Sequence, residues 1–245
     1  MRHALIVLLA VSCLGGFVQA QTAEELVDKN IQAKGGLEKI KAITSVRMTG
    51  KFEGGEGFTA QVSQQNKRPN LVRETFSLQG MTAITAYDGS HGWQIRPFGG
   101  HKDAERIGED RLRDLLLDAD FDGPLVDYKE KGNTIEYLGH DEVDGDDALR
   151  LKVTLKNGDI IYYFLDPDTN LEIRKEVQQF IRGSIREKVY ELGSYKAVNG
   201  VMYPFSISQG SKNNPREQTT TVEKMEVNLP IPDSDFALPA SLKAK

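Results

Sequence analysis

Histidines are few in this sequence, and none is placed for catalysis. Outside residues 1–20, only His91, His101 and His140 occur. None has a partner at metal-ligand or catalytic-triad spacing, and no serine lies in a nucleophile-elbow pattern. Because acid–base and nucleophilic chemistry needs converging titratable groups, we expect no catalytic residues, no bound cofactor and no enzymatic activity.

A glycine-rich segment, Gly54-Gly55-Glu56-Gly57, also has a chemical interpretation. Glycine-rich loops bind phosphate when they open a helix, because the helix N-terminus then faces the anion. Here the glycines join two stretches that alternate like strands. We therefore expect a turn at this position and not a phosphate site.

Two acidic runs could attract a cation. Asp118-Ala-Asp120-Phe-Asp122-Gly123 matches the first half of a calcium-binding loop, but the closing glutamate would fall at position 129, which is a lysine. Glu130 is one residue late. A solvated loop at a helix end and a weak calcium site both stay open, and we expect no metal. The second run, residues 141–147, spans a predicted hairpin, where carboxylates are usual on turn positions; a cation or partner site is the alternative.

The charge balance argues against nucleic-acid binding. The 245 residues include 31 Lys and Arg against 36 Asp and Glu, a formal net charge of −5. No basic surplus is present to neutralise phosphates. We expect no nucleic-acid partner.

The first residues resemble a secretory signal peptide. Met1-Arg2-His3 is followed by the apolar run Ala4–Val11 and by Val18-Gln19-Ala20, with small residues at the positions that determine cleavage. Cleavage after Ala20 leaves residues 21–245 as one exported, cysteine-free domain, and we expect it in the periplasm. Lipidation at the only cysteine, Cys13, is the alternative, and it would anchor the chain to a membrane.

Apolar periodicity predicts two helices. Residues 22–43 begin with a capping box of Thr22 and Glu25 and carry apolar side chains at helical spacing. Gly35-Gly36 should break this segment, since glycine costs about 1 kcal/mol against alanine inside a helix. Residues 104–117 form the second predicted helix, with its leucines on one side.

The rest of the chain alternates with a period of two, which is typical of half-buried strands. Turn residues separate the segments at regular intervals, as in an antiparallel meander. The expected strands are 45–52, 58–64, 71–78, 82–87, 92–96, 151–156, 160–165, 171–180, 185–195, 201–208 and 218–227. This order predicts a mainly β (α+β) fold, one curved sheet with helices on one face. We expect Phe236 to anchor the proline-rich tail, residues 230–239.

One predicted strand is apolar on both faces, Ile160–Leu165. A strand with one solvated face should alternate, so both sides of this one must be covered. It is either a central strand beneath a helix or a strand with one face lining a hydrophobic cavity.

Several short motifs follow one another in a familiar order. They are Gly35-Gly36 with Leu37-Glu38-Lys39-Ile40, Tyr87-Asp88-Gly89 with Gly92-Trp93, Gly123-Pro124-Leu125, Tyr163-Phe164-Leu165-Asp166, Gly200-Val201-Met202-Tyr203-Pro204-Phe205 and Asp235-Phe236-Ala237-Leu238-Pro239. In this order the chain resembles the outer-membrane lipoprotein-sorting (LolA/LolB-like) superfamily over essentially all of residues 21–245. The resemblance implies a strongly curved antiparallel sheet, an unclosed half-barrel, with helices covering its concave face and acyl chains held between them.

Ten residues are expected to line the hydrophobic groove, unless they only pack against one another as a dry core. They are Met48, Phe52, Trp93, Ile95, Leu112, Leu115, Leu116, Phe164, Phe205 and Met225. The function expected from this groove is a periplasmic carrier of a lipid or acylated lipoprotein. The alternative is an envelope module that senses lipid or protein without transport, together with a membrane-anchored partner.

Overall fold

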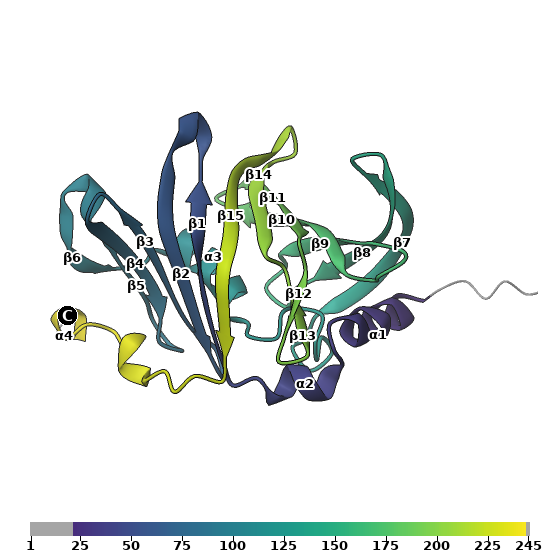
Figure 1. Cartoon of the computed structure of the whole chain (residues 1–245), viewed down its shortest axis with the longest axis horizontal. Helices are drawn as coiled ribbons and strands as arrows, with labels where there is room; N and C mark the ends of the chain where they lie inside the picture. Colours follow the sequence, from purple (N-terminus) through teal and green to yellow (C-terminus); the bar gives the residue numbers. More distant parts are fainter. Residues whose placement is uncertain (1–21, 244–245) are drawn as a thin grey trace, which may run out of the picture.

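The computed structural model describes residues 22–243, so the expected signal peptide, residues 1–20, lies outside the described residues. Thirteen strands form one antiparallel sheet in the order β6-β5-β4-β3-β2-β1-β15-β14-β11-β10-β9-β8-β7, and its end strands β6 and β7 do not pair (Figure 1). Its two halves meet at β1 and β15. The mainly β, unclosed half-barrel expected from the sequence is confirmed.

The strands follow the alternating segments closely. Their bounds are β1 (Ser45–Glu53), β2 (Thr59–Lys67), β3 (Leu71–Leu78), β4 (Met81–Tyr87), β5 (Gly92–Arg96), β6 (His101–Arg106), β7 (Thr134–Val143), β8 (Asp146–Thr154), β9 (Ile160–Leu165), β10 (Glu172–Ile181), β11 (Ser184–Gly193), β12 (Lys196–Val198), β13 (Val201–Tyr203), β14 (Ser206–Ser211) and β15 (Asn214–Val227). The pair β12 and β13 forms a separate two-stranded sheet.

The first helical segment breaks where the glycines predict. Helix α1 (Ala23–Ala33) starts at the Thr22–Glu25 capping box, and α2 (Leu37–Ala42) follows after the break. Gly35 has a φ of +120°, and a Cβ on it would lie 2.2 Å from the carbonyl oxygen of Gly200. Only glycine allows this close approach between the helix break and the β12–β13 turn.

The second helix is shorter than its sequence pattern suggests. Helix α3 covers Glu109–Ala119, with Gly108 at its N-cap, and α4 is a short C-terminal turn, Ala240–Lys243. The expected start at Ala104 was wrong, because His101–Arg106 pairs with β5 as the last strand of this half of the sheet. The expected strand 201–208 was also wrong. It divides at Pro204, which has no N–H to donate to a ladder.

Sheet curvature has a local cause at the centre. The β1–β15 register shifts at Thr49 and Gly50, so that β15 carries an extra residue there. Such a bulge bends and twists the strand that contains it. A Cβ on Gly50 would lie 2.3 Å from the Thr221 carbonyl oxygen, so this position needs glycine.

The concave face of the β7–β11 half is a packed core. Leu26 and Val27 of α1 and Leu125 cover a layer of strand residues, which are Leu149, Leu151, Val153, Ile161, Tyr163, Leu165 and Val177. The apolar strand β9 is therefore a central strand under a helix. Its other face, Tyr162 and Phe164, packs near Val143 and Ala148 and lies under the Arg150 guanidinium.

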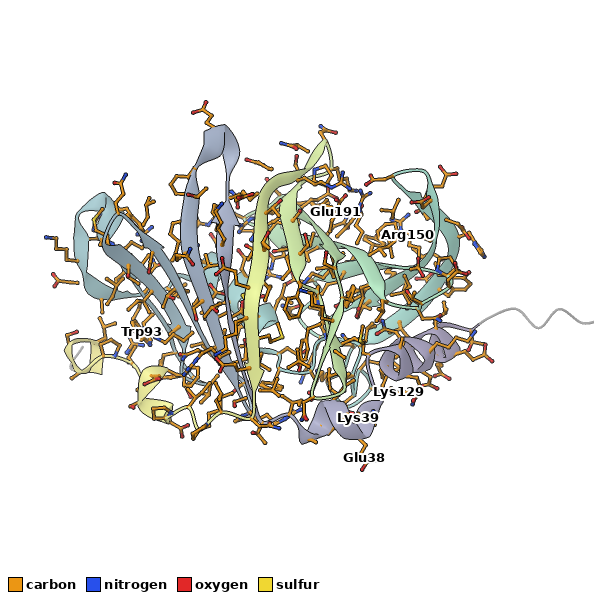
Figure 2. The ribbon with its side chains drawn as sticks, viewed as in Figure 1. Glu38, Lys39, Trp93, Lys129, Arg150 and Glu191 are labelled. Atoms are coloured by element: carbon orange, nitrogen blue, oxygen red, sulfur yellow. The ribbon has the colours of Figure 1, made fainter. Side chains whose placement is uncertain are left out.

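A C-terminal segment covers the convex face of the other half. Phe236 is fully buried, as expected for the anchor of the tail. The indole Nε1 of Trp93 donates to the Phe236 carbonyl at 2.9 Å, and Leu238 and Leu242 pack beside Trp93. Figure 2 shows Trp93 beside this segment. Within residues 22–243, no helix has the length and apolar character required to cross a membrane.

Candidate ligand-binding site

Strand register decides which expected groove residues face the concave side. Met48 and Met225 stand directly opposite each other on β1 and β15, and opposed residues share one face. Phe52 is on the same face of β1 as Met48, since they are four residues apart in the strand. All three lie on the concave face; Met48 lines both chambers described below, whereas Phe52 and Met225 line neither.

Three other expected residues lie on the convex face. Trp93 and Ile95 pack under the C-terminal segment, and Phe164 packs under the β7–β8 hairpin. Their neighbours Gln94 and Tyr163 point to the concave side instead. The expectation for these three was wrong because both faces of β5 and β9 are covered, and apolar character alone does not distinguish the faces.

The remaining four expected residues are spread over α3 and the β13–β14 connection. Leu112 and Leu115 pack with Val72 and Tyr87 into a small core between α3 and the sheet. Leu116 is 40% exposed on the other side of the helix. Phe205 is buried, with the Lys196 ammonium 4.4 Å from its ring centre. None of the four lines either chamber described next.

A cavity of about 710 Å³ occupies the concave face over β1–β5. We call it the phenylalanine chamber. Its apolar lining consists of Met48, Val62, Phe76, Ala83 and Phe98, and polar side chains, among them Arg96, His101 and Arg111, line it as well. Phe76 lies at the centre of an aromatic cluster, with ring centres 5.3 Å from Phe52, 5.9 Å from Phe58 and 6.0 Å from Phe98. The sequence analysis missed Phe76. Its spacing of two residues from Glu74 and four from Val72 would have placed all three on one face of β3.

A second cavity of about 460 Å³ continues toward α1 and α2, and we call it the tyrosine chamber. Four tyrosines line it, Tyr163, Tyr190, Tyr195 and Tyr203. The two chambers share Met48, Gln64, Glu74 and Thr220, so they adjoin. The concave site therefore has an apolar part and a polar part. The sequence predicted only the apolar one.

Charged side chains occur in the tyrosine chamber. Burial, with Asp118 nearby, raises the pKa of Glu74 to about 8. Burial also raises the pKa of the Asp118 carboxyl and lowers the pKa of the Lys175 ammonium. Glu74 and Lys175 are half-buried, and Asp118 is exposed where it lines the chamber.

Other charges around the chamber are paired. Lys34 Nζ lies 3.0 Å from the Glu172 carboxylate, and the Tyr195 hydroxyl donates to the Glu172 carbonyl at 2.8 Å. Burial alone would raise the pKa of Glu172, but Lys34 outweighs burial and the pKa is lowered. This pair joins α1 to β10 and has no charge left for a ligand.

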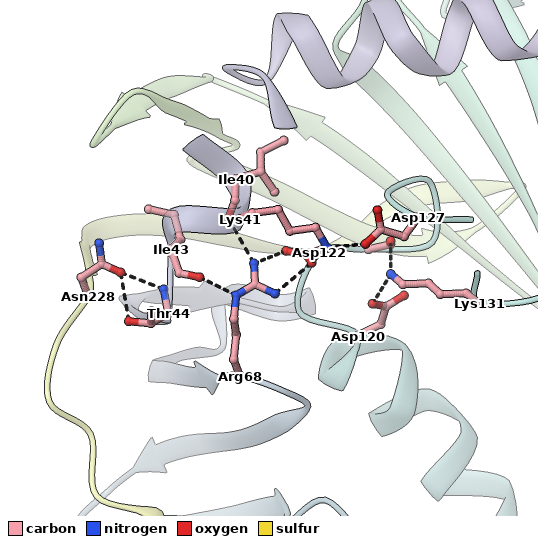
Figure 3. Close-up of polar contacts among 11 residues, drawn as sticks. Ile40, Lys41, Ile43, Thr44, Arg68, Asp120, Asp122, Asp127, Lys131 and Asn228 are labelled. Atoms are coloured by element: carbon pink, nitrogen blue, oxygen red, sulfur yellow. Dashed lines mark hydrogen bonds and ion pairs between the residues drawn. The ribbon is translucent and has the colours of Figure 1, made fainter. Parts of the chain in front are cut away.

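Two of the three carboxylates of the first acidic run, Asp120 and Asp122, are neutralised by basic side chains (Figure 3). Arg68 donates to both carboxylate oxygens of Asp122, at 2.9 and 2.5 Å, and Lys41 contacts Asp122 at 2.7 Å. Lys131 contacts Asp120 at 2.5 Å and donates to the Gly123 carbonyl at 2.7 Å. A calcium ion would have to displace these ammonium and guanidinium groups.

We therefore expect millimolar calcium to leave the melting temperature unchanged. A bound cation would stabilise the folded state by mass action, and Asp120 and Asp122 already have cationic partners. Thermal melting with calcium and with a chelator measures the effect. A rise of several degrees that Asp120→Ala abolishes would instead establish a calcium site.

The second acidic run forms the β7–β8 hairpin, as expected. Asp141 accepts from Arg150 at 2.9 Å, and Asp147 contacts His140 Nδ1 at 2.9 Å. Asp144, at the turn, pairs with Arg174 and Arg216. Among residues 22–243, no group of three or more His, Cys, Asp or Glu side chains is arranged to hold a metal.

Solved structures share this fold at low sequence identity. A DUF1329 family protein from Desulfovibrio piger superposes with a TM-score of 0.61 at 12% identity, covering 88% of this chain and 97% of that one. A LolA superfamily protein from Nitrosomonas europaea gives 0.57 at 12% identity, with coverages of 89% and 99%. A domain described as an outer membrane lipoprotein-sorting protein, from Vibrio parahaemolyticus, gives 0.55 at 13% identity, with coverages of 86% and 97%. No protein-family model and no curated protein matches the sequence.

Proposed function

From the LolA-like fold that the chain shares with these structures, we propose that the protein is a periplasmic carrier that holds acyl chains of a lipid or lipoprotein in the phenylalanine chamber. One observation carries this proposal: a cavity of about 710 Å³ with an apolar lining lies on the concave face of the sheet. That volume is within the range of ligand pockets, about 300–1,000 Å³. The N-terminal segment, with its signal-peptide pattern, supports export.

The lining is sufficient for useful affinity. Burying one methylene contributes about 0.8 kcal/mol, so roughly ten buried methylenes contribute on the order of 8 kcal/mol, from which the cost of association is subtracted. Methionine and aromatic side chains, here Met48, Phe76 and Phe98, adapt their packing to an irregular ligand. The chamber therefore needs no specific polar contact to hold a chain.

We expect Phe76→Asp to weaken binding of a fluorescent fatty-acyl probe at least tenfold, because it places a carboxylate in the apolar lining. The probe is titrated into protein stripped of co-purified lipid. Phe180→Asp is the matched control, since Phe180 is 65% exposed and should leave both affinity and melting unchanged. Leu115→Ala should cost about 2–5 kcal/mol of stability but leave the affinity of the folded protein unchanged.

Failure of the unmutated protein to bind any acyl probe at micromolar concentration would contradict the proposal. The alternative function, an envelope sensing module, is favoured by the β10–β11 hairpin. There the paired residues Phe180 and Ile185 are 65% and 66% exposed, and exposed apolar patches mark contact surfaces. Movement of probe lipid from donor to acceptor vesicles distinguishes the two, because only a carrier catalyses transfer.

A further inference from the structure

Three charged side chains in the tyrosine chamber have no ionic partner. Glu74, Asp118 and Lys175 line this cavity, and within residues 22–243 none of their side chains forms an ion pair or a side-chain hydrogen bond. The Lys175 Nζ lies 4.5 Å from the centre of the Tyr190 ring. A ligand with complementary charges could form a charge-assisted hydrogen bond with each of the three.

Nearby cations act on these carboxylates without forming ion pairs with them: Arg111 and Lys188 favour ionised Glu74, and Lys175 and Lys188 favour ionised Asp118. Arg186 and Lys188 both contact Asp114, at 3.1 and 2.8 Å. Arg111, on the phenylalanine-chamber side, donates to the Thr85 hydroxyl at 3.4 Å. Glu172 and Asp122 have their own cations. The unpaired set is thus two carboxylates and one ammonium.

The position of the set relative to the apolar lining is also informative. Glu74 lines both chambers and marks their junction. An amphiphile with its chain in the phenylalanine chamber would therefore place its polar end beside Glu74. The hydroxyl-bearing rings of Tyr163, Tyr190 and Tyr203 line the same space and provide further hydrogen-bonding groups.

We propose that the tyrosine chamber binds a zwitterionic lipid head group that carries a primary ammonium and a phosphate. Glu74 and Asp118 receive the ammonium, and Lys175 binds the phosphate as a compact cation. This inference rests on the proposed function, because it takes the acyl chain to lie in the adjoining phenylalanine chamber. A ligand ammonium in contact with the two carboxylates also favours their ionised forms.

The test compares two lysophospholipids that carry the same acyl chain. We expect lysophosphatidylethanolamine to bind at least tenfold more tightly than lysophosphatidylglycerol, whose head has a phosphate but no ammonium. Glu74→Gln and Asp118→Asn, separately, should remove most of this preference while keeping the affinity for lysophosphatidylglycerol. Asp147→Asn, in the exposed β7–β8 hairpin, is the matched control and should retain the full preference. Lys175→Met should weaken both lysolipids.

Each remaining outcome has a definite meaning. Equal binding of the two lysolipids, or a preference that survives both Glu74→Gln and Asp118→Asn, overturns the head-group inference and leaves acyl binding intact. Absence of binding by either lysolipid contradicts the proposed function itself. Soluble glycerophosphoethanolamine, tested alone, should bind far more weakly; binding as tight as the lysolipid overturns the lipid assignment. Circular dichroism melts confirm that each variant is folded, and Asp118→Asn alone carries the test if Glu74→Gln unfolds.

Discussion

Replacing Arg68 with alanine should lower the free energy of unfolding by about 3–5 kcal/mol, the usual cost of breaking a buried ion pair from one side. The Asp122 side chain is only 6% exposed and loses both of its guanidinium contacts. Arg68 also donates to the carbonyls of Ile40 and Ile43, at 3.1 and 2.7 Å, and stacks 4.5 Å from the Phe121 ring centre. One side chain thus connects α2, the β2–β3 turn and the segment after α3.

Urea denaturation measures the decrease in the free energy of unfolding. Lys51→Ala is the matched control. Lys51 contacts Glu53 at 2.7 Å with both side chains exposed, so its removal should cost about 0–1 kcal/mol. An equally small effect for Arg68→Ala would show that Lys41 alone can hold Asp122.

The loss for Arg68→Ala should also depend on pH. Burial alone would raise the pKa of Asp122, but Arg68 and Lys41 outweigh burial and hold it below its ordinary value. A carboxyl with a lowered folded pKa stabilises the fold above its unfolded pKa of about 3.9 and loses that contribution as the pH falls through the folded pKa. The difference in the free energy of unfolding between the unmutated protein and Arg68→Ala should therefore be largest at pH 7 and should become smaller in strong acid.

Replacing Phe236, the anchor of the tail, with alanine should lower the free energy of unfolding by a comparable amount. Phe236 is fully buried, and truncating such a phenylalanine to alanine typically costs about 3–5 kcal/mol. Trp93, which donates to the Phe236 carbonyl, is the only tryptophan in the chain. Its fluorescence therefore reports directly on the tail, and we expect a red shift in Phe236→Ala as water reaches the indole.

Phe180→Ala is the control for this variant, because an exposed side chain should change stability by no more than about 0.5 kcal/mol. Acyl-probe affinity should stay unchanged in Phe236→Ala, since the tail covers the convex face and the probe enters the concave one. Loss of probe binding without a change in Trp93 fluorescence would mean that the two faces are coupled in a way this packing does not explain.

Alternation along the strands was enough to predict the architecture and much of the element order. It could not predict which face of each strand is concave. In β5, Gly92 and Gln94 face inward while Trp93 and Ile95 face the tail. The apolar side of this strand is outside only because residues 236–242 return to cover it. That contact is between segments far apart in the sequence, and no local pattern encodes it.

The polar half of the site was missed for a different reason. Glu74 on β3 and Lys175 on β10 each look like an ordinary charged residue of an alternating strand. Only the curvature of the sheet brings them, with Asp118 from α3, into one cavity. Because sheet curvature depends on features such as the bulge opposite Gly50, their proximity follows from tertiary structure and not from spacing.

The order of strands in the sheet has a consequence for how the chain reaches this fold. Within β1–β6 and within β7–β11, strands that are consecutive in sequence are neighbours in the sheet. In contrast, β1 pairs with β15 across nearly the whole described chain. Local hairpins form early and long-range pairing forms late, since closing a long loop costs entropy before any contact repays it. Each half should therefore collapse first, and the joining of Val46 to Val227 should limit the refolding rate. Until residues 214–227 arrive, β1 presents an open strand edge, which makes the unfinished chain most prone to aggregation during that interval.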